Sequence, residues 1–531
     1  MRKYYRDLRE FLQKLEEGGL LRTVQRPINK DLELMPVVRW QFRGNLPESA
    51  RKAFLFKNVT DGRGNKYSMP VLVGGYAASR NIYALGMMCS PEEIAAKWND
   101  AQMHPVKPIL LETGPVHEEV HLGAGLLNHG GIGEFPVPVS TPGLDNAPYL
   151  SNANWVTKDP ETGERNLGNY RAMIKSATRT GVFSGSHLFT HWKKCRAKGI
   201  PLQAAVVIGA SPNIIYVGAG KPAYGTDEYA VAGGIAGEPV ELVRCKTVDL
   251  EVPATAEIVF EGEIPTDSLE REAPFGEYTG YMGMNTMSPY FNVTCITHRR
   301  DAIYSAFISQ FPPSESSVMR GIGREAAWFK LLRHDCNIAG VLRVAFHQTS
   351  GSGPYAVIQM KKYGPGDAWQ ALHAAYSFNP PTVKFIIAVD EDIDPGDPDS
   401  VNWAMSFRVQ PHRDIRIVEG RPAGLDVSAA PPDAPDSERA FPSPSGSSAA
   451  LIDATRKFDY PPVALPRQEY MERARKIWEE EGWEKLNPKV PWHGYPLGYW
   501  TKEQEEEADL AIRGEYYRTG TKLEEKERKK L

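Results

Sequence analysis

The chain has 531 residues, of which 41% are hydrophobic and 24% are charged, so its composition is that of a globular protein rather than a disordered or fibrous one. This length predicts two or three domains. The formal net charge of −4 arises from scattered charges and gives no global reason to expect nucleic-acid binding. The five cysteines include no CxxC pair, which argues against a disulfide framework and against a cysteine zinc site.

The first part of the chain predicts an α/β domain over residues 1–125. Leucines and aromatic residues at helical spacing among charges indicate an amphipathic helix from Tyr5 to about Leu15. The apolar run of a signal peptide or a membrane span is missing there, so we expect a cytoplasmic protein with no membrane contact. The further elements expected in this domain are strands at 21–25, 53–56 and 71–73 and a helix at 91–98.

Residues 126–320 predict a β-rich central domain. It begins with a Gly- and Pro-rich connection at 126–152. Short runs of β-branched or aromatic residues separated by turn residues then indicate a barrel or sandwich. These runs lie at 204–208, 214–217, 240–243, 257–260, 290–297 and 302–307, and one helix is expected from Asn169 to about Thr180.

The α/β pattern returns over residues 321–460, and residues 461–531 predict a charged helical extension suited to oligomer contacts. The strand at 383–389 runs into Asp390-Glu391-Asp392, whose carboxylates can serve a site or cap the next element. The other elements expected in this domain are helices at 324–332 and 366–376 and strands at 340–346 and 356–360.

The segment from His117 to His121 matches the pattern HExxH, which binds zinc when it lies on a helix. Gly114-Pro115 before it and Gly123 after it instead favour a short, solvated strand. A zinc hydrolase that uses these two histidines is therefore kept only as an alternative function.

Two other segments carry groups suited to a cofactor. A turn around Gly168 brings Asn166 and Arg171 close together at an expected helix start, where they can bind an anion or a metal-bound phosphate. His187 and Glu228, further along, complete a mixed set of an amide, an imidazole and a carboxylate that suits Mn²⁺, Mg²⁺ or Fe²⁺.

The strongest local pattern is EAPFGEYTGY, in which Glu272 and Glu277 bracket a Pro-Phe-Gly turn. Two carboxylates held near an arginine can have their pKa values pushed apart, so that one donates a proton while the other stays ionised. Capping of the turn by Glu277 is the alternative interpretation.

Taken in order, these segments resemble the UbiD family of prenylated-flavin decarboxylases. The resemblance also rests on DLREFLQKLEEGG, FPPSESSVMRG, KFIIAVDEDID and IDATRKF. It implies a central split β-barrel of flavin-reductase type that binds prenylated FMN and a divalent metal, with K⁺ as a further candidate ion. The implied reaction is the reversible, non-oxidative decarboxylation of an aromatic, heteroaromatic or α,β-unsaturated acid, with CO₂ as product.

The resemblance also assigns residues. The metal ligands would be Asn166, His187 and Glu228, with His191 close to the expected imidazole. The catalytic set would be Arg171, Glu272 and Glu277, with Glu277 as proton donor. The cofactor would further contact Asn169, Tyr170, Arg171 and Ser186.

Several points stay open at this stage. The substrate can be a free acid or a CoA thioester, and the roles of Arg320 and Lys384 are undecided. Ala449 stands where the ubiquinone-pathway branch carries lysine, which puts a phosphate contact there in doubt. The resemblance implies a homo-oligomer, either a dimer or a hexamer, and a flavin prenyltransferase as the source of the cofactor. A catalytically inactive subunit of a carboxylase complex is the second alternative function.

Overall fold

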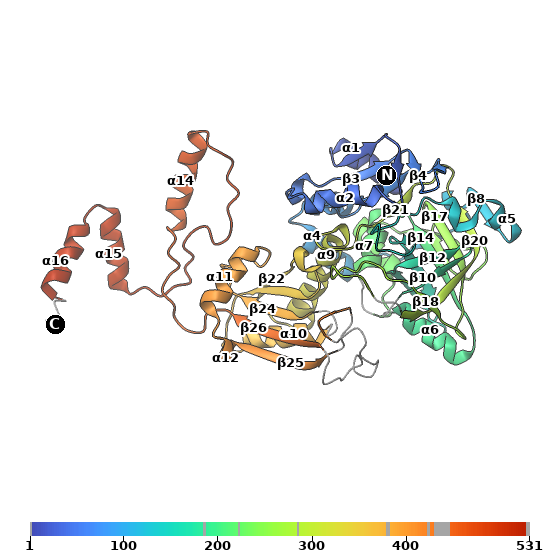
Figure 1. Ribbon diagram of the computed structural model, residues 1–531. Coiled ribbons are helices and arrows are strands. Elements are labelled where there is room, and N and C mark those ends of the chain that lie inside the picture. Colours follow the sequence, from blue (N-terminus) through green and yellow to red (C-terminus); the bar gives the residue numbers. More distant parts are fainter. Residues whose placement is uncertain are drawn as a thin grey trace.

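The computed structural model describes residues 3–183, 187–220, 224–283, 286–378, 383–421, 425–429 and 447–526. Figure 1 shows a body made of an N-terminal part, a central sheet and a C-terminal α/β part, with the C-terminal helices extending away from it. In the described residues, no helix is long and apolar enough to cross a membrane.

The N-terminal part begins with α1 (Leu8–Glu17), which buries its leucines and Phe11. The Asp7 side chain caps this helix by accepting a hydrogen bond from the Glu10 N–H group. A four-stranded sheet follows, in the order β1 (Leu21–Val24), β3 (Ala53–Phe56), β6 (Val71–Val73) and β21 (Tyr304–Ala306). The predicted strands at 21–25, 53–56 and 71–73 are confirmed. Because β21 comes from far along the chain, this sheet is completed by residues outside 1–125.

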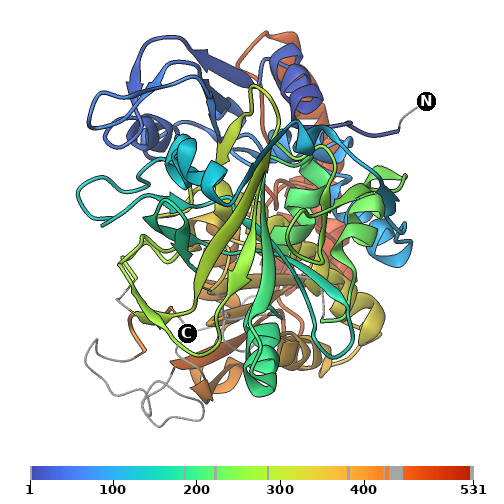
Figure 2. The same ribbon diagram turned by 90° about the vertical axis from the view of Figure 1, so that its right-hand side faces the viewer.

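The central sheet has nine strands and curls into a half-barrel, visible in green and yellow-green in Figure 2. Its seven-residue strands β14 (Leu202–Ile208) and β17 (Ile258–Ile264) pair along their whole length. The β-rich centre expected from the sequence is therefore present. The other strands of this sheet are β8 (Glu119–Leu122), β9 (Tyr149–Leu150), β10 (Asn154–Lys158), β11 (Arg165–Asn169), β12 (Ala172–Ser176), β13 (Arg179–Gly181) and β20 (Tyr290–His298).

Two predictions in this region are wrong. The expected strand at 214–217 lies in a buried helix, α7 (Pro212–Gly220), because an apolar run does not distinguish a buried helix from a buried strand. Pro212 at its start fits the first helical turn. The expected helix from Asn169 to Thr180 is instead β12 and β13, which pair with each other, and β13 also pairs with β20. Cross-strand pairing here outweighs the local helical spacing.

The C-terminal part has a five-stranded sheet covered by helices. The strand order is β22 (Val341–Phe346), β23 (Tyr355–Met360), β24 (Phe385–Val389), β26 (Ser447–Ala454) and β25 (Ile415–Arg421). The main helices are α9 (Glu315–Lys330), α10 (Asp367–Phe378) and α11 (Pro398–Arg408). These elements confirm the predicted strands and helices of this part, with boundaries shifted by a few residues and by nine at the start of α9.

The acidic run after β24 is structural rather than part of a site. The guanidinium of Arg408, at the end of α11, donates to Asp390 at 2.8 Å and to Asp392 at 2.7 Å. All three side chains are buried. The carboxylates therefore hold α11 against the sheet.

The chain ends with α14 (Gln468–Glu480), α15 (Lys502–Ile512) and α16 (Tyr516–Lys526), which lie away from the body in Figure 1. Neither α14 nor α15 buries any residue. Large apolar side chains such as Ile477, Trp483 and Ile512 are about half exposed. The extension thus has an apolar surface that the single chain leaves uncovered.

Candidate active site

The three residues predicted to be catalytic lie together. Arg171 follows β11, Glu272 ends β18 (Glu270–Glu272), and Glu277 lies in the turn after it. The Nε atom of Arg171 donates to Oε1 of Glu272 at 3.1 Å, and its Nη1 atom forms an ion pair with Glu277. The side chains of Arg171, Glu272 and Glu277 are 9%, 0% and 12% exposed. One buried guanidinium therefore lies between two carboxylates.

The surroundings of this cluster are largely apolar. The Arg171 guanidinium lies 4.0 Å from the centre of the Phe183 ring and 5.5 Å from that of Phe275. Burial raises the pKa of Glu272, and the charge of Arg171 opposes this shift. Because one positive charge faces two carboxylates, the site favours a state in which one of them carries a proton. Such an arrangement can deliver a proton to a bound molecule.

The Pro-Phe-Gly turn places Glu277 through close packing. A Cβ atom on Gly276 would lie only 2.4 Å from Cγ of Gln310, so this position has no room for a side chain. The N–H group of Glu277 donates to the carbonyl of Tyr281 at 2.8 Å. Its carboxylate pairs with Arg171, so the alternative that this side chain only caps its own turn does not describe the structure.

Asn166, His187 and Glu228, the predicted metal ligands, line one small pocket. Nδ1 of His187, at the start of α6 (His187–Lys198), lies 3.0 Å from Oδ1 of Asn166. Glu228 begins α8 (Glu228–Ala236), where the Asp227 side chain caps the helix. The Glu228 carboxylate is 2% exposed and accepts a hydrogen bond from the Leu167 N–H group at 3.0 Å. Burial raises its pKa to about 8.

The donor set in this pocket fits a divalent cation. Asn166 is 4% exposed, and its Nδ2 atom has no hydrogen-bond partner among the residues that the structure describes. An amide rotated about its terminal bond would offer its oxygen in place of that nitrogen. Together with an imidazole and a buried carboxylate, this set suits Mn²⁺, Mg²⁺ or Fe²⁺.

The neighbouring imidazole, that of His191, forms a hydrogen bond outside this donor set. Nδ1 of His191 lies 2.9 Å from Oγ1 of Thr157, and burial lowers the pKa of His191 to about 4. Both histidines reach the pocket, but His187 is the one paired with Asn166. The geometry therefore favours His187 as the imidazole of this set.

The remaining predicted cofactor contacts lie on or beside the same segment. Asn169 is the last residue of β11, and its amide donates to Asn152 at 3.4 Å. Tyr170 is buried, and its carbonyl accepts a hydrogen bond from the Trp155 indole at 2.9 Å. Ser186 lies outside the described residues.

Sequence reasoning missed one carboxyl group near this cluster. Asp145 lies in the Gly- and Pro-rich connection and accepts a hydrogen bond from the Thr141 N–H group at 2.6 Å. Burial raises its pKa to about 6, while backbone N–H groups, including that of Gly276, and the charge of Arg171 oppose the shift. The local sequence reads only as a turn, because the approach to Arg171 depends on tertiary packing.

The HExxH pattern does not form the helix that a zinc hydrolase requires. His117 ends a short 3₁₀ turn, η2 (Pro115–His117), whereas His121 lies on β8. The prediction of a solvated strand is thus confirmed for 119–122, where Val120 and Leu122 are exposed, and it is wrong only for His121, which is 7% exposed. Burial lowers the pKa of His117 to about 4.

The structure gives contacts for three further positions. Lys384, just before the central strand β24 of the C-terminal sheet, pairs with Asp426 at 2.9 Å. Arg320 donates to the Gly351 carbonyl at 3.0 Å, and its guanidinium lies 4.1 Å from the centre of the Tyr278 ring. It is therefore held beside the turn that carries Glu277. Ala449 is buried within β26.

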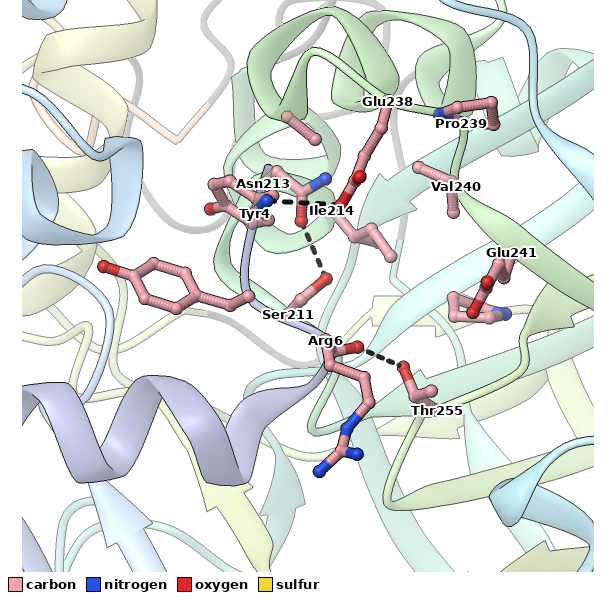
Figure 3. A pocket seen from close by; sticks show the side chains of 13 residues that line it. Tyr4, Arg6, Ser211, Asn213, Ile214, Glu238, Pro239, Val240, Glu241 and Thr255 are labelled. Carbon is pink, nitrogen blue, oxygen red and sulfur yellow. Dashed lines mark hydrogen bonds between the residues drawn. The ribbon is translucent and has the colours of Figure 1, made fainter. Parts of the chain in front are cut away.

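A different pocket, drawn in Figure 3, contains none of the predicted site residues. Its polar groups pair with one another: the Tyr4 N–H group donates to Glu238 at 3.2 Å, and the Thr255 hydroxyl donates to the Arg6 carbonyl at 3.1 Å. We interpret it as the joint between the N-terminal segment and the central part.

Comparison with known proteins accounts for most of the chain. Models of the 3-octaprenyl-4-hydroxybenzoate carboxy-lyase N-terminal, Rift-related and C-terminal domains match residues 12–102, 111–312 and 317–454. An uncharacterized protein of Archaeoglobus fulgidus is 29% identical over 513 residues, which are 90% of this chain and 98% of that protein.

Solved structures agree with these matches. An evolved dimeric form of the UbiD-class enzyme HmfF from Pelotomaculum thermopropionicum, in complex with prFMN, is similar with a TM-score of 0.75 and 29% identity, covering 89% of this chain and all of that one. Apo 3,4-dihydroxybenzoic acid decarboxylase (AroY) from Klebsiella pneumoniae is similar with a TM-score of 0.73 and 25% identity, covering 92% of this chain and 97% of that one. The chain therefore belongs to the UbiD family.

Proposed function

We propose that this protein is a reversible, non-oxidative decarboxylase of an aromatic, heteroaromatic or α,β-unsaturated carboxylic acid, using prenylated FMN and a divalent metal. One observation carries the proposal: the Arg171 guanidinium is held between the carboxylates of Glu272, which is fully buried, and Glu277, which is 12% exposed. Asn166, which lines the expected metal pocket, lies on β11 and precedes Arg171 by five residues. The similarity to a UbiD-class enzyme in complex with prFMN supports the choice of cofactor.

The cofactor and its metal have residues suited to them. Asn166, His187 and Glu228 would hold a divalent ion, Mn²⁺ in the first instance, and through it a phosphate group. When bound, the prenylated flavin would supply the electron sink that decarboxylation at an sp² carbon needs and that amino-acid side chains lack. K⁺ stays a prediction from the family resemblance.

The residues around Arg171 would orient the acid and move the proton. Because the Nε donor of Arg171 is bound by Glu272, the rest of the guanidinium faces Glu277 and can instead pair with a substrate carboxylate. Glu277 would then give a proton to the carbon that has lost CO₂. The Phe183 and Phe275 rings beside the guanidinium limit access of water and strengthen these charge interactions.

The alternative of an inactive subunit is not favoured, because Arg171, Glu272 and Glu277 are all present and in contact. The test is to produce the full chain with and without a flavin prenyltransferase. Each preparation is examined by visible absorption and mass spectrometry and screened for CO₂ release from aromatic acids and aryl-CoA thioesters. We expect release only with the prenylated cofactor. A preparation that carries this cofactor and releases no CO₂ from any acid would favour the inactive-subunit alternative.

We also propose that residues 461–531 mediate homo-oligomer formation, as a dimer or a hexamer. The exposed apolar side chains of this extension, including Ile477 and Trp483, support the proposal. A chain truncated after residue 460 should have a lower mass in light scattering than the full chain. An unchanged oligomeric mass would place the contacts elsewhere.

A further inference from the structure

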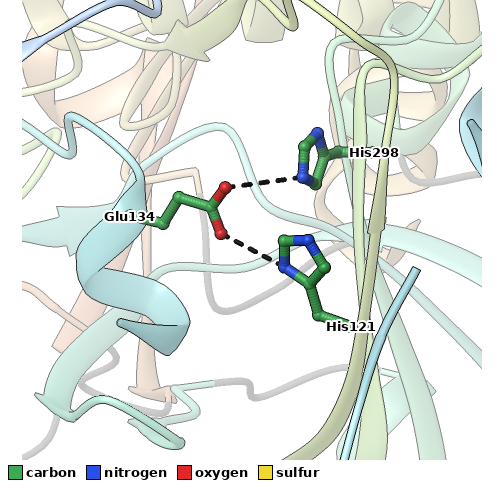
Figure 4. Close-up of side chains that lie close together, drawn as sticks. All are labelled: His121, Glu134 and His298. Carbon is green, nitrogen blue, oxygen red and sulfur yellow. Dashed lines mark ion pairs between the residues drawn. The ribbon is translucent and has the colours of Figure 1, made fainter. Parts of the chain in front are cut away.

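Outside the proposed active site, His121, Glu134 and His298 direct their side chains toward one another (Figure 4). Oε2 of Glu134 lies 3.3 Å from Nδ1 of His121, and its Oε1 lies 3.5 Å from Nε2 of His298. One ligand atom from each residue falls within 4.8 Å of the other two. Both histidines are buried, and the Glu134 side chain is 23% exposed.

Sheet register brings the two histidines together. Strand β8 pairs antiparallel with β20, so that His121 lies opposite Ile296, and His298 is two residues further along the same face. Such diagonal neighbours across a strand pair are close enough for long side chains to meet. The backbone of the half-barrel therefore fixes the spacing of the two imidazoles.

Glu134 is held by a separate set of contacts. It ends η3 (Gly131–Glu134), in which the Ile132 N–H group donates to the Ala177 carbonyl at 2.8 Å. Gly131 has a positive φ of 58°, and a Cβ atom there would lie 2.1 Å from that carbonyl oxygen, so glycine is required. On the other side of Glu134, the Phe135 ring packs edge-on against His298. The carboxylate is thus placed before any ligand binds.

The two separations are longer than ordinary hydrogen bonds, and they join the two histidines to different oxygens of one carboxylate, which could bind a shared ion through both oxygens. An N–H···O bond normally spans about 2.7–3.2 Å. Two ligands that each lie about 2.0–2.1 Å from a tetrahedral ion are separated by about 3.3–3.4 Å. Moreover, Nδ1 of His121, Oε2 of Glu134 and Nε2 of His298 are all buried and without a hydrogen-bond partner among the described residues.

The hydrogen bonding of the His298 ring also favours a bound cation. Its Nδ1 atom lies 2.8 Å from the Arg299 carbonyl, which can only accept, so Nδ1 carries the proton. In the neutral ring, Nε2 then presents a lone pair to a carboxylate oxygen, and these two groups repel unless a proton or a metal cation lies between them. A backbone carbonyl that accepts a hydrogen bond from the other ring nitrogen is a usual partner of a metal-binding histidine.

We infer that His121, Glu134 and His298 form a binding site for a divalent transition-metal ion of the Zn²⁺ class, separate from the Asn166 pocket. Two imidazoles and one carboxylate form a set that zinc accepts, with a fourth position left for water. Because His117 lies outside this cluster, the site is not the HExxH centre of a zinc hydrolase. The ion would fasten the connection that carries Glu134 to the edge of the half-barrel.

The test uses the full chain, stripped of metal with a chelator and titrated with Co²⁺, whose visible absorption reports tetrahedral coordination. The Glu228→Gln substitution is included throughout, so that the Asn166 pocket does not contribute. We expect one equivalent to bind with strong visible bands, and Zn²⁺ to displace it and raise Tm by about 3 °C at a hundredfold excess over Kd.

Glu134→Gln and His298→Gln should each weaken binding by at least about 100-fold, whereas His104→Ala should not change it. His104 is a matched control because it pairs with Asp100 at 2.8 Å as an exposed histidine and carboxylate. If the parent binds no Co²⁺, or if Glu134→Gln binds it as tightly as the parent, the inference fails. The three side chains would then form only an imidazolium–carboxylate cluster. The parent titration decides the question even if a variant does not fold.

Discussion

Glu272 and Arg171 are 101 residues apart in the sequence, yet Oε1 of the fully buried glutamate lies 3.1 Å from Nε of the arginine. This contact fixes the guanidinium and leaves its other face to Glu277. The two carboxylates around Arg171 are therefore suited to two different roles, positioning and proton transfer. In the proposed mechanism, Glu272 would position the arginine and Glu277 would transfer the proton.

Glu277→Gln should lose turnover by about 10²–10⁴-fold while retaining flavin and metal, because a general acid contributes that much and the amide keeps the shape of the side chain. The matched control is Glu270→Gln, on the same segment, whose carboxylate pairs with Lys175 and Arg179 instead. We expect the control to stay within a few-fold of the parent. Turnover by Glu277→Gln at a similar level would transfer the proton-donor role to another group.

Glu228→Gln and Asn166→Ala should each reduce the flavin content of the purified protein to a small fraction of the parent's while the chain stays folded. The reason is that these residues would bind the metal that neutralises the flavin phosphate. Flavin absorbance per chain and far-UV circular dichroism measure the two quantities. Glu164→Gln, on the rim of the same pocket, serves as the control. Stoichiometric flavin in both Glu228→Gln and Asn166→Ala would contradict the ligand assignment.

Asp145 should make stability depend on pH in a defined direction. Its pKa in the folded chain is about 6, above the value of about 3.9 for an unfolded aspartate. The folded state therefore binds the proton more tightly, and this group's contribution to the free energy of unfolding falls as pH rises from about 4 to about 6. The free energy of unfolding of Asp145→Asn, measured relative to that of the parent, should therefore be more favourable to the variant at pH 7 than at pH 4.5. Denaturant unfolding of flavin-free protein tests this, and an equal difference at both pH values would contradict it.

Arg408→Met should destabilise the C-terminal part by about 3–5 kcal/mol, because it leaves Asp390 and Asp392 buried without their partner. Lys384→Met removes a more exposed ion pair and should cost less than about 1 kcal/mol. Thermal and denaturant unfolding compare the two variants. Equal stability of Arg408→Met and the parent would show that this cluster adds nothing to the fold.

Local patterns were sufficient to predict many strands, whereas the residues of the candidate site were assigned through the resemblance to the UbiD family. The runs at 53–56 and 71–73 become β3 and β6 with the predicted boundaries, because short β-branched and aromatic segments between turn residues favour strands. The run at 214–217 has the same local character but is buried within a helix, so tertiary contacts decided its structure. The assignment of Asn166, Arg171 and Glu277 rested on motifs found in a fixed order along the chain, not on hydrophobic periodicity.

Other features depend on distant parts of the chain and had no local signal. The charge of Arg171 acts on Asp145 only because tertiary packing brings the two residues near each other. The cluster of His121, Glu134 and His298 requires the pairing of β8 with β20, strands that are separated by well over 100 residues. A single sequence shows these histidines and this glutamate but does not show that they lie close together in the fold.

The most direct test of the proposed function follows the proton that replaces the carboxylate. The protein loaded with prenylated flavin is incubated in D₂O with an acid that it decarboxylates, and the product is analysed by mass spectrometry and NMR. We predict one deuterium at the carbon that carried the carboxylate, and at least about a 100-fold slower incorporation with Glu277→Gln. Incorporation at the parental rate in Glu277→Gln, or a product without deuterium at that carbon, would contradict proton delivery by the cluster around Arg171.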